Sequence, residues 1–246
     1  MCTVVLRWQP GEAVPVQMLA LRDEFASRSF DLPGEWWPEQ PGLIGGRDQR
    51  AGGTWCVSHV ASGATAVVLN RPERMLADPG AASRGVLPLL AIEHREQWID
   101  QLDVRPMAGF NLVLVTPTSC CWWSWNGTAF AGRGLEAGTH MITPLGLRTG
   151  ALPQALQRGH FHDPSPTAGS RTADAWPEWL EVVQASKPTS DRTEGMVVQR
   201  LIGDDSYETV FGQLIAAQPG ALRLDYLERV ARDPRGPWTT RSYEVG

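Results

Sequence analysis

Short apolar runs that alternate with glycine-containing turns restrict the fold of this chain more than any other feature. The runs Cys2–Trp8 and Val14–Arg22 flank the turn signal Pro10-Gly11, and together they predict an antiparallel hairpin. Further strands are expected at Thr54–Val60, Thr65–Asn70, Asn111–Thr116, Cys120–Trp125, Thr128–Gly132, His140–Thr143 and Trp238–Val245. Because a hairpin joins neighbouring strands in opposite directions, these runs indicate an antiparallel sheet.

Helices are expected mainly in the last third of the chain. The predicted helical regions are Ser83–Leu102, Leu152–Arg158, Trp176–Ala185, Tyr207–Ala217 and Arg223–Arg232. The segment 30–49 is rich in proline, glycine and tryptophan, which predicts a loop. Strands followed mainly by helices predict the α+β class, in one domain that spans residues 1–246.

Charge and composition argue against several kinds of function. The net charge of -5 disfavours nucleic-acid binding, which needs a basic surface. No run approaches the roughly 20 apolar residues of a membrane-spanning helix, and the first residues lack the pattern of a signal peptide. The four cysteines show no C-x-x-C spacing, which favours a reducing compartment and a cytoplasmic protein. Lys187 is the only lysine and lies in a loop, so imine chemistry is not expected.

Cys2 is the sharpest candidate for a reactive group. Removal of Met1 would expose a residue with both a thiol and a free α-amine, and an amine with a pKa of about 7.7–8.0 can accept the thiol proton. In the predicted hairpin, Cys2 lies roughly opposite Leu21 and Arg22, beside Asp23. An arginine lowers the pKa of a nearby thiol, and a carboxylate orients an amine. The alternative is a chance cysteine in a strand, next to a solvated ion pair at the strand end.

Other polar residues give weaker signals. Asn70 ends a predicted strand and offers its side-chain amide to an oxyanion, or is a turn residue before Arg71-Pro72. His160 and His162 can share one side of a strand, but no third ligand has suitable spacing, so no metal site is predicted. The 11 tryptophans are expected mainly in the core, with a pocket for a large apolar ligand as the alternative.

A series of short motifs runs through nearly the whole chain. The motifs are Met1-Cys2-Thr3, Leu21-Arg22-Asp23-Glu24-Phe25, Gly52-Gly53-Thr54-Trp55, Ala66–Asn70 before Arg71, Ser83-Arg84-Gly85, Phe110-Asn111-Leu112, Gly138-Thr139-His140 and Thr240-Arg241-Ser242. In this order they resemble the NRDE family, the family of transport and Golgi organisation protein 2. That family is similar to the N-terminal-nucleophile hydrolases, among which the penicillin V acylases and bile salt hydrolases are closest in motif.

The resemblance implies a fold and a set of residue roles. The implied fold is a four-layer αββα sandwich of the N-terminal-nucleophile hydrolase type. The implied nucleophile is Cys2, supported by Arg22 and Asp23, with Asn70 as an oxyanion donor and Arg241 as a late active-site arginine.

Two departures from the family pattern bear on activity. Leu21 stands where the family has asparagine, and Thr143-Pro144 stands where a Ser-Asn pair would help to form the oxyanion hole. Proline offers neither a side-chain amide nor a backbone donor, and loss of one oxyanion donor costs about 10²–10³ in rate.

Two functions therefore follow from the resemblance. The first is a cysteine amidohydrolase or acyltransferase that acts on an amide or thioester bond of a small acylated substrate and needs no cofactor. The second is a non-catalytic protein that binds or carries haem or an acyl lipid in the same pocket, since members of the family are linked to haem trafficking and lipid homeostasis. A structural protein without a small ligand is the third reading.

Overall fold

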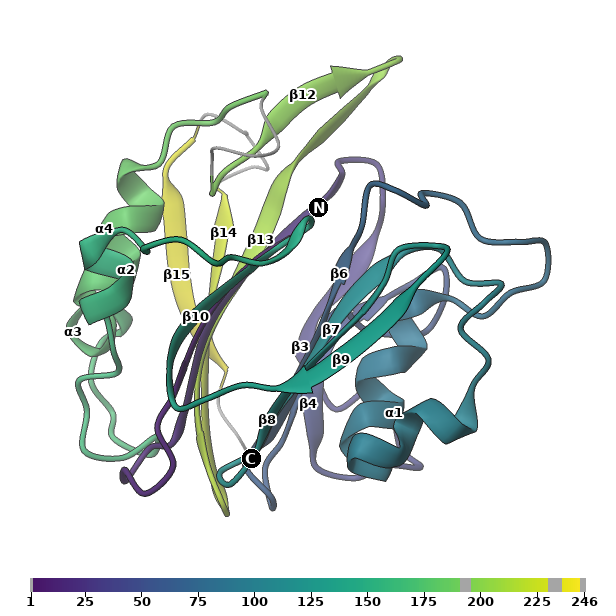
Figure 1. The fold of residues 1–246 in the computed structure, drawn as a ribbon. Coiled ribbons are helices and arrows are strands. Elements are labelled where there is room, and N and C mark those ends of the chain that lie inside the picture. The colour runs from purple at the N-terminus through teal and green to yellow at the C-terminus, as the bar shows by residue number, and fades with distance from the viewer. Residues whose placement is uncertain (1, 191–195, 230–235, 244–246) are drawn as a thin grey trace.

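The computed structural model describes residues 2–190, 196–229 and 236–243. Within them the chain forms two antiparallel β-sheets that face each other, with helices on the outer side of each sheet (Figure 1). The α+β class predicted from the sequence is confirmed. The described strands and helices leave a core between the two sheets and a further core beneath each group of helices.

The first sheet is built from both ends of the described chain. Its strand order is β11-β10-β1-β2-β13-β14-β15, and β12 pairs with β13. The strands are β1 (Thr3–Trp8), β2 (Val16–Phe25), β10 (Gly138–Thr143), β11 (Gly146–Leu147), β12 (Gln199–Ile202), β13 (Asp205–Gln218), β14 (Ala221–Arg229) and β15 (Trp238–Tyr243). The β1–β2 hairpin has the predicted register, with Thr3 opposite Leu21.

The second sheet follows the order of the chain. Its strands are β3 (Phe30–Gly34), β4 (Leu43–Asp48), β5 (Cys56–His59), β6 (Ala64–Asn70), β7 (Phe110–Val115), β8 (Cys120–Trp125) and β9 (Phe130–Gly134). Each strand pairs with its neighbour in sequence. The longest connection, between β6 and β7, contains the helical segments of this half of the molecule.

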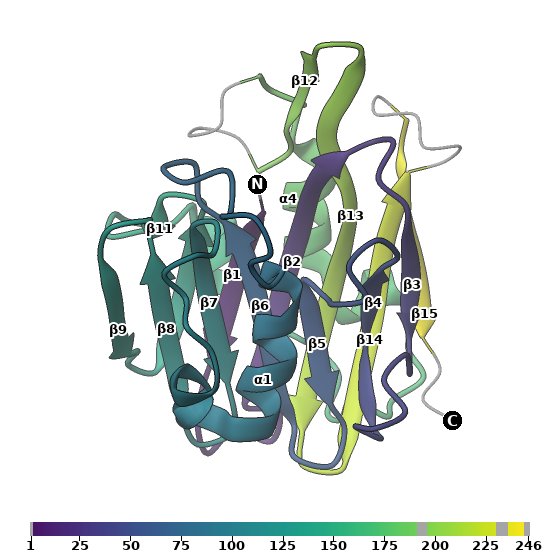
Figure 2. The same ribbon diagram turned by 90° about the vertical axis from the view of Figure 1, so that its right-hand side faces the viewer.

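Helical segments cover the two outer faces. The 3₁₀ segment η1 (Arg84–Val86), α1 (Leu87–His94) and the 3₁₀ segment η2 (Arg95–Gln101) lie over the second sheet, as Figure 2 shows for α1. The helices α2 (Gln154–Arg158), α3 (Thr172–Ala175) and α4 (Pro177–Ala185) pack on the first sheet (Figure 1). Trp98 and Trp176 are fully buried and anchor these two groups.

Three predictions about secondary structure are wrong. The regions Tyr207–Ala217 and Arg223–Arg232, predicted as helices, form β13 and β14, although residues 230–232 lie outside the described part. The segment 30–49, predicted as a loop, contains β3 and β4. Glycine suits β4 because a Cβ at Gly46 would lie 2.1 Å from the ring of Trp55, so the indole packs directly on the strand backbone.

Candidate active site

Cys2 lies just before β1 and is buried, with 6% of its surface exposed. Since Thr3 pairs with Leu21, the next position along the two strands sets Cys2 beside Arg22. Both residues line a pocket of about 340 Å³, together with Asp23 and Asn70. The structure thus brings together four of the five residues that the sequence analysis proposed.

Arg22 is a buried cation in this pocket, with 4% of its surface exposed. Its guanidinium lies 4.7 Å from the ring centre of Phe30 and 4.5 Å from that of Trp55, and cation–π attraction favours this position. Its Nη2 atom is 3.6 Å from Glu24 and 3.9 Å from Asp48. Its Nη1 atom is buried and has no hydrogen-bond partner in the described chain, so one N–H group of this guanidinium is unsatisfied.

Arg28 and Asp48 complete a charged frame around Arg22. Arg28 Nε donates to Asp48 Oδ2 over 2.6 Å and lies 3.7 Å from Glu24. The other carboxylate oxygen of Asp48 accepts hydrogen bonds from the backbone N–H groups of Arg50 and Ala51. Asp48 is therefore fixed by the turn that follows β4, and it holds both arginines in place.

Asp23 is positioned from β13, a strand far away in the sequence. Its Oδ1 accepts a 2.6 Å hydrogen bond from Thr209 Oγ1, and its carbonyl oxygen accepts one from the hydroxyl of Tyr207. The pairing of β2 with β13 shifts register between Thr209 and Phe211, and such a bulge redirects side chains locally. Burial raises the pKa of the Asp23 carboxyl to about 6, against the lowering effect of the Thr209 hydrogen bond and the charge of Arg22.

The thiol of Cys2 is less acidic than its arginine neighbour suggested. Burial raises the pKa of the Cys2 thiol above its ordinary range, and the charge of Asp23 acts in the same direction. The charge of Arg22 and a hydrogen bond with the Asp23 backbone lower it, but burial is the larger effect. Burial also raises the pKa of Cys120 to about 12 and that of Cys121 to about 11.

The structure places Asn70 in the Cys2 pocket but places Arg241 outside it. Asn70 is the last residue of β6, is half-buried and lines the same pocket as Cys2. Arg241 lies on β15, is 65% exposed and pairs with Glu228, at 2.9 Å. β13 and β14 separate its strand from β2, so the structure does not bring Arg241 to Cys2.

Thr143 and Pro144 take part in a contact between the two sheets. Both of their carbonyl oxygens accept hydrogen bonds from Asn111 Nδ2, at 3.1 and 3.2 Å. This contact joins the end of β10 in the first sheet to β7 in the second. Neither residue belongs to the described lining of the Cys2 pocket.

Several residues of the pocket were not predicted from the sequence. Arg28, Asp48 and Tyr207 line it, and Thr209 supports it through Asp23. Thr209 and Tyr207 were hidden because their strand was predicted as a helix, and Asp48 because its strand was predicted as a loop. Arg84, inside a motif quoted for the family resemblance, also lines the pocket.

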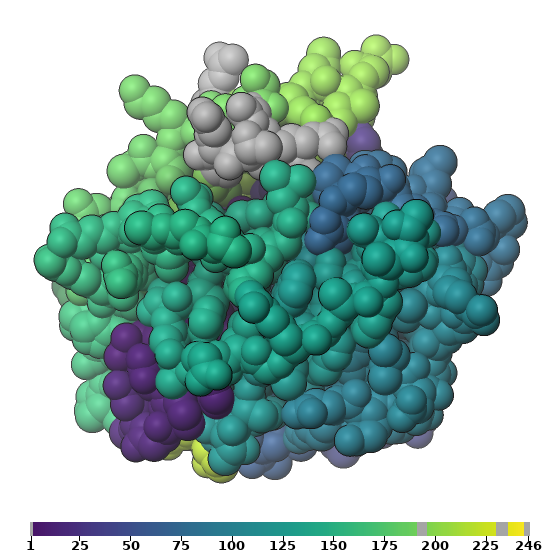
Figure 3. Space-filling model, viewed as in Figure 1, coloured from purple at the N-terminus to yellow at the C-terminus, as the bar shows by residue number. Residues whose placement is uncertain are grey.

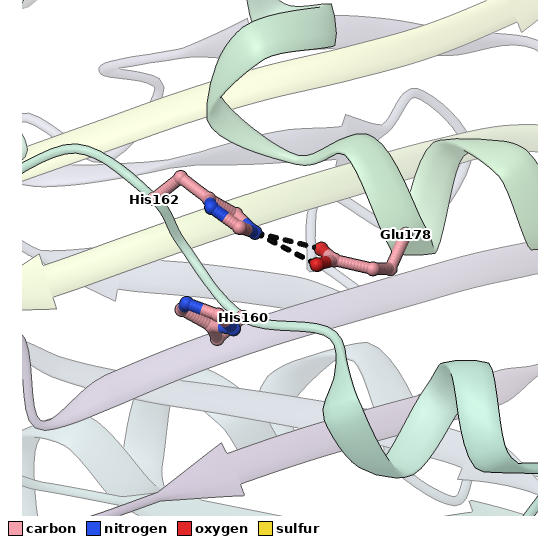
Figure 4. Close-up of side chains that lie close together, drawn as sticks. All are labelled: His160, His162 and Glu178. Atoms are coloured by element: carbon pink, nitrogen blue, oxygen red, sulfur yellow. Dashed lines mark hydrogen bonds and ion pairs between the residues drawn. The ribbon is translucent and has the colours of Figure 1, made fainter.

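A second group of side chains lies on the helical layer of the first sheet. The ligand atoms of His160, His162 and Glu178 lie within 4.8 Å of one another, so Glu178 is the third group that spacing had not revealed. Figure 4 shows His162 Nε2 directed at the Glu178 carboxylate, at 2.8 and 2.9 Å. The two imidazoles stack with ring centres 4.1 Å apart, and His162 and Glu178 form a hydrogen-bonded pair.

A separate cleft of about 140 Å³ lies beside the Cys2 pocket. Phe30 and Leu32 of β3 and Val210 and Phe211 of β13 line it, and Arg28 borders both spaces. The described lining of this cleft includes no cysteine or histidine, so it offers room for an apolar group but no nucleophile.

Asp23→Asn is expected to stabilise the protein more at pH 7 than at pH 4. Folding raises the pKa of Asp23 from 3.8 to about 6, so its stabilising contribution is present below pH 3.8 and lost as the pH rises through 6. Asparagine resembles the protonated acid at every pH. The gain in unfolding free energy over wild type should therefore grow by on the order of 3 kcal/mol across this interval.

Urea unfolding of wild type and Asp23→Asn at pH 4, 5, 6 and 7 measures this difference. Asp174→Asn is the control, because Asp174 is exposed. A stability difference that does not change with pH would show that Asp23 titrates near its ordinary pKa in the folded protein.

Comparison with known proteins identifies one family over the first part of the chain. A family model described as Transport and Golgi organisation 2 matches residues 1–149. No curated protein matches the chain. Among the helices of the described residues, none has the length and apolar character needed to cross a membrane.

Proposed function

This chain belongs to the Transport and Golgi organisation 2 family, and from that premise we propose that it is a cysteine-dependent hydrolase or acyltransferase. The bond attacked is the carbon–nitrogen bond of an amide, or a thioester, in a small acylated substrate. The observation that carries the proposal is the meeting of Cys2, Asp23 and the unpartnered Nη1 of Arg22 in one pocket.

Each of these residues has a role in the proposed reaction. Removal of Met1 gives Cys2 a free α-amine, which takes the proton of the thiol. The thiolate sulfur then bonds to the substrate carbonyl carbon while Asn70 donates its amide to the oxyanion. The carbon–nitrogen bond breaks, and the amine leaves with the proton taken from the thiol. Water next attacks the thioester, releases the carboxylic acid and restores the thiol.

Arg22 and Asp23 act on the groups that carry this chemistry. The buried charge of Arg22 stabilises the thiolate, against the burial that disfavours it. Asp23 is a carboxylate at pH 7, since its pKa is about 6, and it orients the α-ammonium that forms when the thiol ionises.

The proposal extends to the fold and to the extent of the domain. Helices outside two facing sheets agree with an αββα sandwich of the N-terminal-nucleophile type. Residues beyond 149 belong to the same unit in this proposal, because Thr209 of β13 positions Asp23 of β2. The site therefore depends on strands outside the segment that the family model matches.

A second function competes for the same pocket. The raised pKa of Cys2 keeps the thiol protonated at neutral pH, and Pro144 supplies no oxyanion donor. Both observations favour binding without turnover, and the ligand is then haem or an acyl lipid. Burial of an apolar tail would provide most of the affinity for the acyl lipid.

A trapped acyl-enzyme distinguishes the two functions. The protein is incubated with a panel of N-acyl amides and acyl thioesters, quenched with acid and measured by intact mass. We expect an acyl adduct on the peptide that begins at Cys2, because a thioester is the intermediate of the proposed reaction. Saturable binding of haem or acyl lipid, with no adduct and no product, would replace the hydrolase with the carrier.

The same mass measurement tests the proposed base. Protein from its native host should lack Met1, since only then does Cys2 carry a free α-amine. Full retention of Met1 in a protein that still turns over substrate would contradict the role given to that amine.

A further inference from the structure

Arg84 is a cation in the Cys2 pocket to which the proposed reaction gives no role. It begins η1, directly after the connection from β6, and it is partly buried. Nη1 donates to the carbonyl oxygen of Gly109 over 3.0 Å. Within the part of the chain that the structure describes, no carboxylate lies within 4.0 Å of its nitrogens.

Two of the three arginines in the described lining of the pocket are paired with carboxylates. Arg22 and Arg28 share the carboxylates of Glu24 and Asp48, at distances between 2.6 and 3.9 Å. Asp23, the third carboxylate of this lining, accepts a hydrogen bond from Thr209 and forms no ion pair with Arg84. Arg84 is therefore the one arginine of the described lining that has no carboxylate within 4.0 Å.

A partly buried charge without a nearby counterion is unfavourable. Burial lowers the pKa of Arg84, while the charges of Glu24 and Cys2 act on it from a greater distance. The planar guanidinium uses one nitrogen for Gly109, which leaves its other edge for two parallel hydrogen bonds to an oxyanion. A ligand with a negative charge would supply the partner that Arg84 lacks.

Apolar side chains border the same pocket. Met75 and Leu76, on the connection between β6 and η1, are 51% and 83% exposed. Trp55 and Val68 line the pocket more deeply, with 8% and 4% exposed. Figure 3 shows this part of the chain, in blue, at the upper right of the molecule. The pocket thus combines an apolar rim with an arginine that has no carboxylate partner.

We propose that Arg84 binds a carboxylate or phosphate group of the substrate, while Met75 and Leu76 contact its acyl chain. This inference rests on the proposed function and names its substrate class. The substrate is an acyl amide or acyl thioester that carries a negative charge near the bond that breaks. Arg84 selects the substrate and takes no part in the covalent steps.

The test measures binding without turnover, in the Cys2→Ala background. The probes share one acyl chain: N-dodecanoylglycine is a carboxylate, N-dodecanoyl-phosphoethanolamine is a phosphate, and N-dodecanoylglycinamide is neutral. Isothermal titration should give a dissociation constant at least about tenfold lower for one or both anions than for the neutral amide. The anion that binds more tightly identifies the group.

Variants at position 84 assign the preference. Arg84→Gln should abolish it and leave the affinity for the neutral amide within about twofold, which also shows that the pocket is intact. Arg84→Lys keeps the charge but loses the planar fork, so part of the preference should remain. Arg50→Gln is the matched control, because Arg50 is an exposed arginine outside this pocket.

Equal affinity for the anionic and neutral probes, no saturable binding of any probe, or a preference that survives in Arg84→Gln would each overturn the inference. Turnover of N-dodecanoylglycine by the protein with Cys2 intact tests the proposed function separately. Turnover without a charge preference contradicts the role of Arg84 alone. A charge preference without turnover supports Arg84 as a binding residue and contradicts the hydrolase.

Discussion

Cys2→Ala is expected to lower the turnover of an amide or thioester substrate by at least about 10³-fold. No other described side chain in the pocket offers a thiol, so the substitution removes the only group proposed to form the acyl intermediate. Cys2→Ser should be nearly as inactive, because a hydroxyl is far less acidic than a thiol. The measurement is initial rate against substrate concentration for each purified variant.

Cys121→Ala controls for the loss of a cysteine elsewhere. Cys121 lies on β8 in the second sheet, and its thiol hydrogen bonds to Glu96, outside the Cys2 pocket. Its turnover should match wild type within about twofold. Undiminished activity in Cys2→Ala, in a protein whose urea midpoint is unchanged, would remove Cys2 from the mechanism.

The local sequence pattern was sufficient to predict the part of the site that Cys2, Arg22, Asp23 and Asn70 form. Pro10-Gly11 fixes a short connection, and a short connection fixes which residues of β1 and β2 face each other. The position of Cys2 beside Arg22 and Asp23 follows from that register alone. Asn70 was also within reach, because the apolar run Ala66–Leu69 ends directly before it.

The rest of the site, which includes Asp48, Tyr207 and Thr209, depends on strand pairings that no local sequence pattern predicts. β13 is buried on both faces along most of its length, so its residues show no alternation of apolar and polar positions. β14 carries four charged residues among its nine, Arg223, Asp225, Glu228 and Arg229, a charge content that is unusual for a buried strand. In the structure Arg223 and Asp225 are buried, at 6% and 0% exposure, and the charges pair inside the protein. Thr209 could not be assigned to Asp23 while its strand was taken for a helix.

Arg223 and Asp225 of β14 belong to a buried polar network that connects the first sheet to its helices. Arg223 Nε donates to Asp225 Oδ2 over 2.8 Å, and the indole N–H of Trp176 donates to the same oxygen over 2.9 Å. Ser242 on β15 donates to Asp225 Oδ1. Arg223 also donates to Asp163 and to the carbonyl oxygen of Ser170, both in the segment before α3.

Asp225→Ala is expected to lower the free energy of unfolding by about 3–5 kcal/mol. The substitution leaves the buried guanidinium of Arg223 with one carboxylate, Asp163, and leaves the Trp176 N–H without its acceptor. Asp225→Asn should cost less, because an amide oxygen can still accept from the indole. Urea unfolding followed by tryptophan fluorescence measures the change.

Asp174→Ala is the matched control, since its partner Arg171 is 83% exposed and Asp174 itself is 53% exposed. Solvent screens that ion pair, and its loss should change the free energy of unfolding by less than about 0.5 kcal/mol. The contrast separates burial from mere charge pairing, because both substitutions remove one aspartate next to one arginine. A cost for Asp225→Ala as small as that of Asp174→Ala would show that β14 and its helices are held by apolar packing, and that the network adds no net stability.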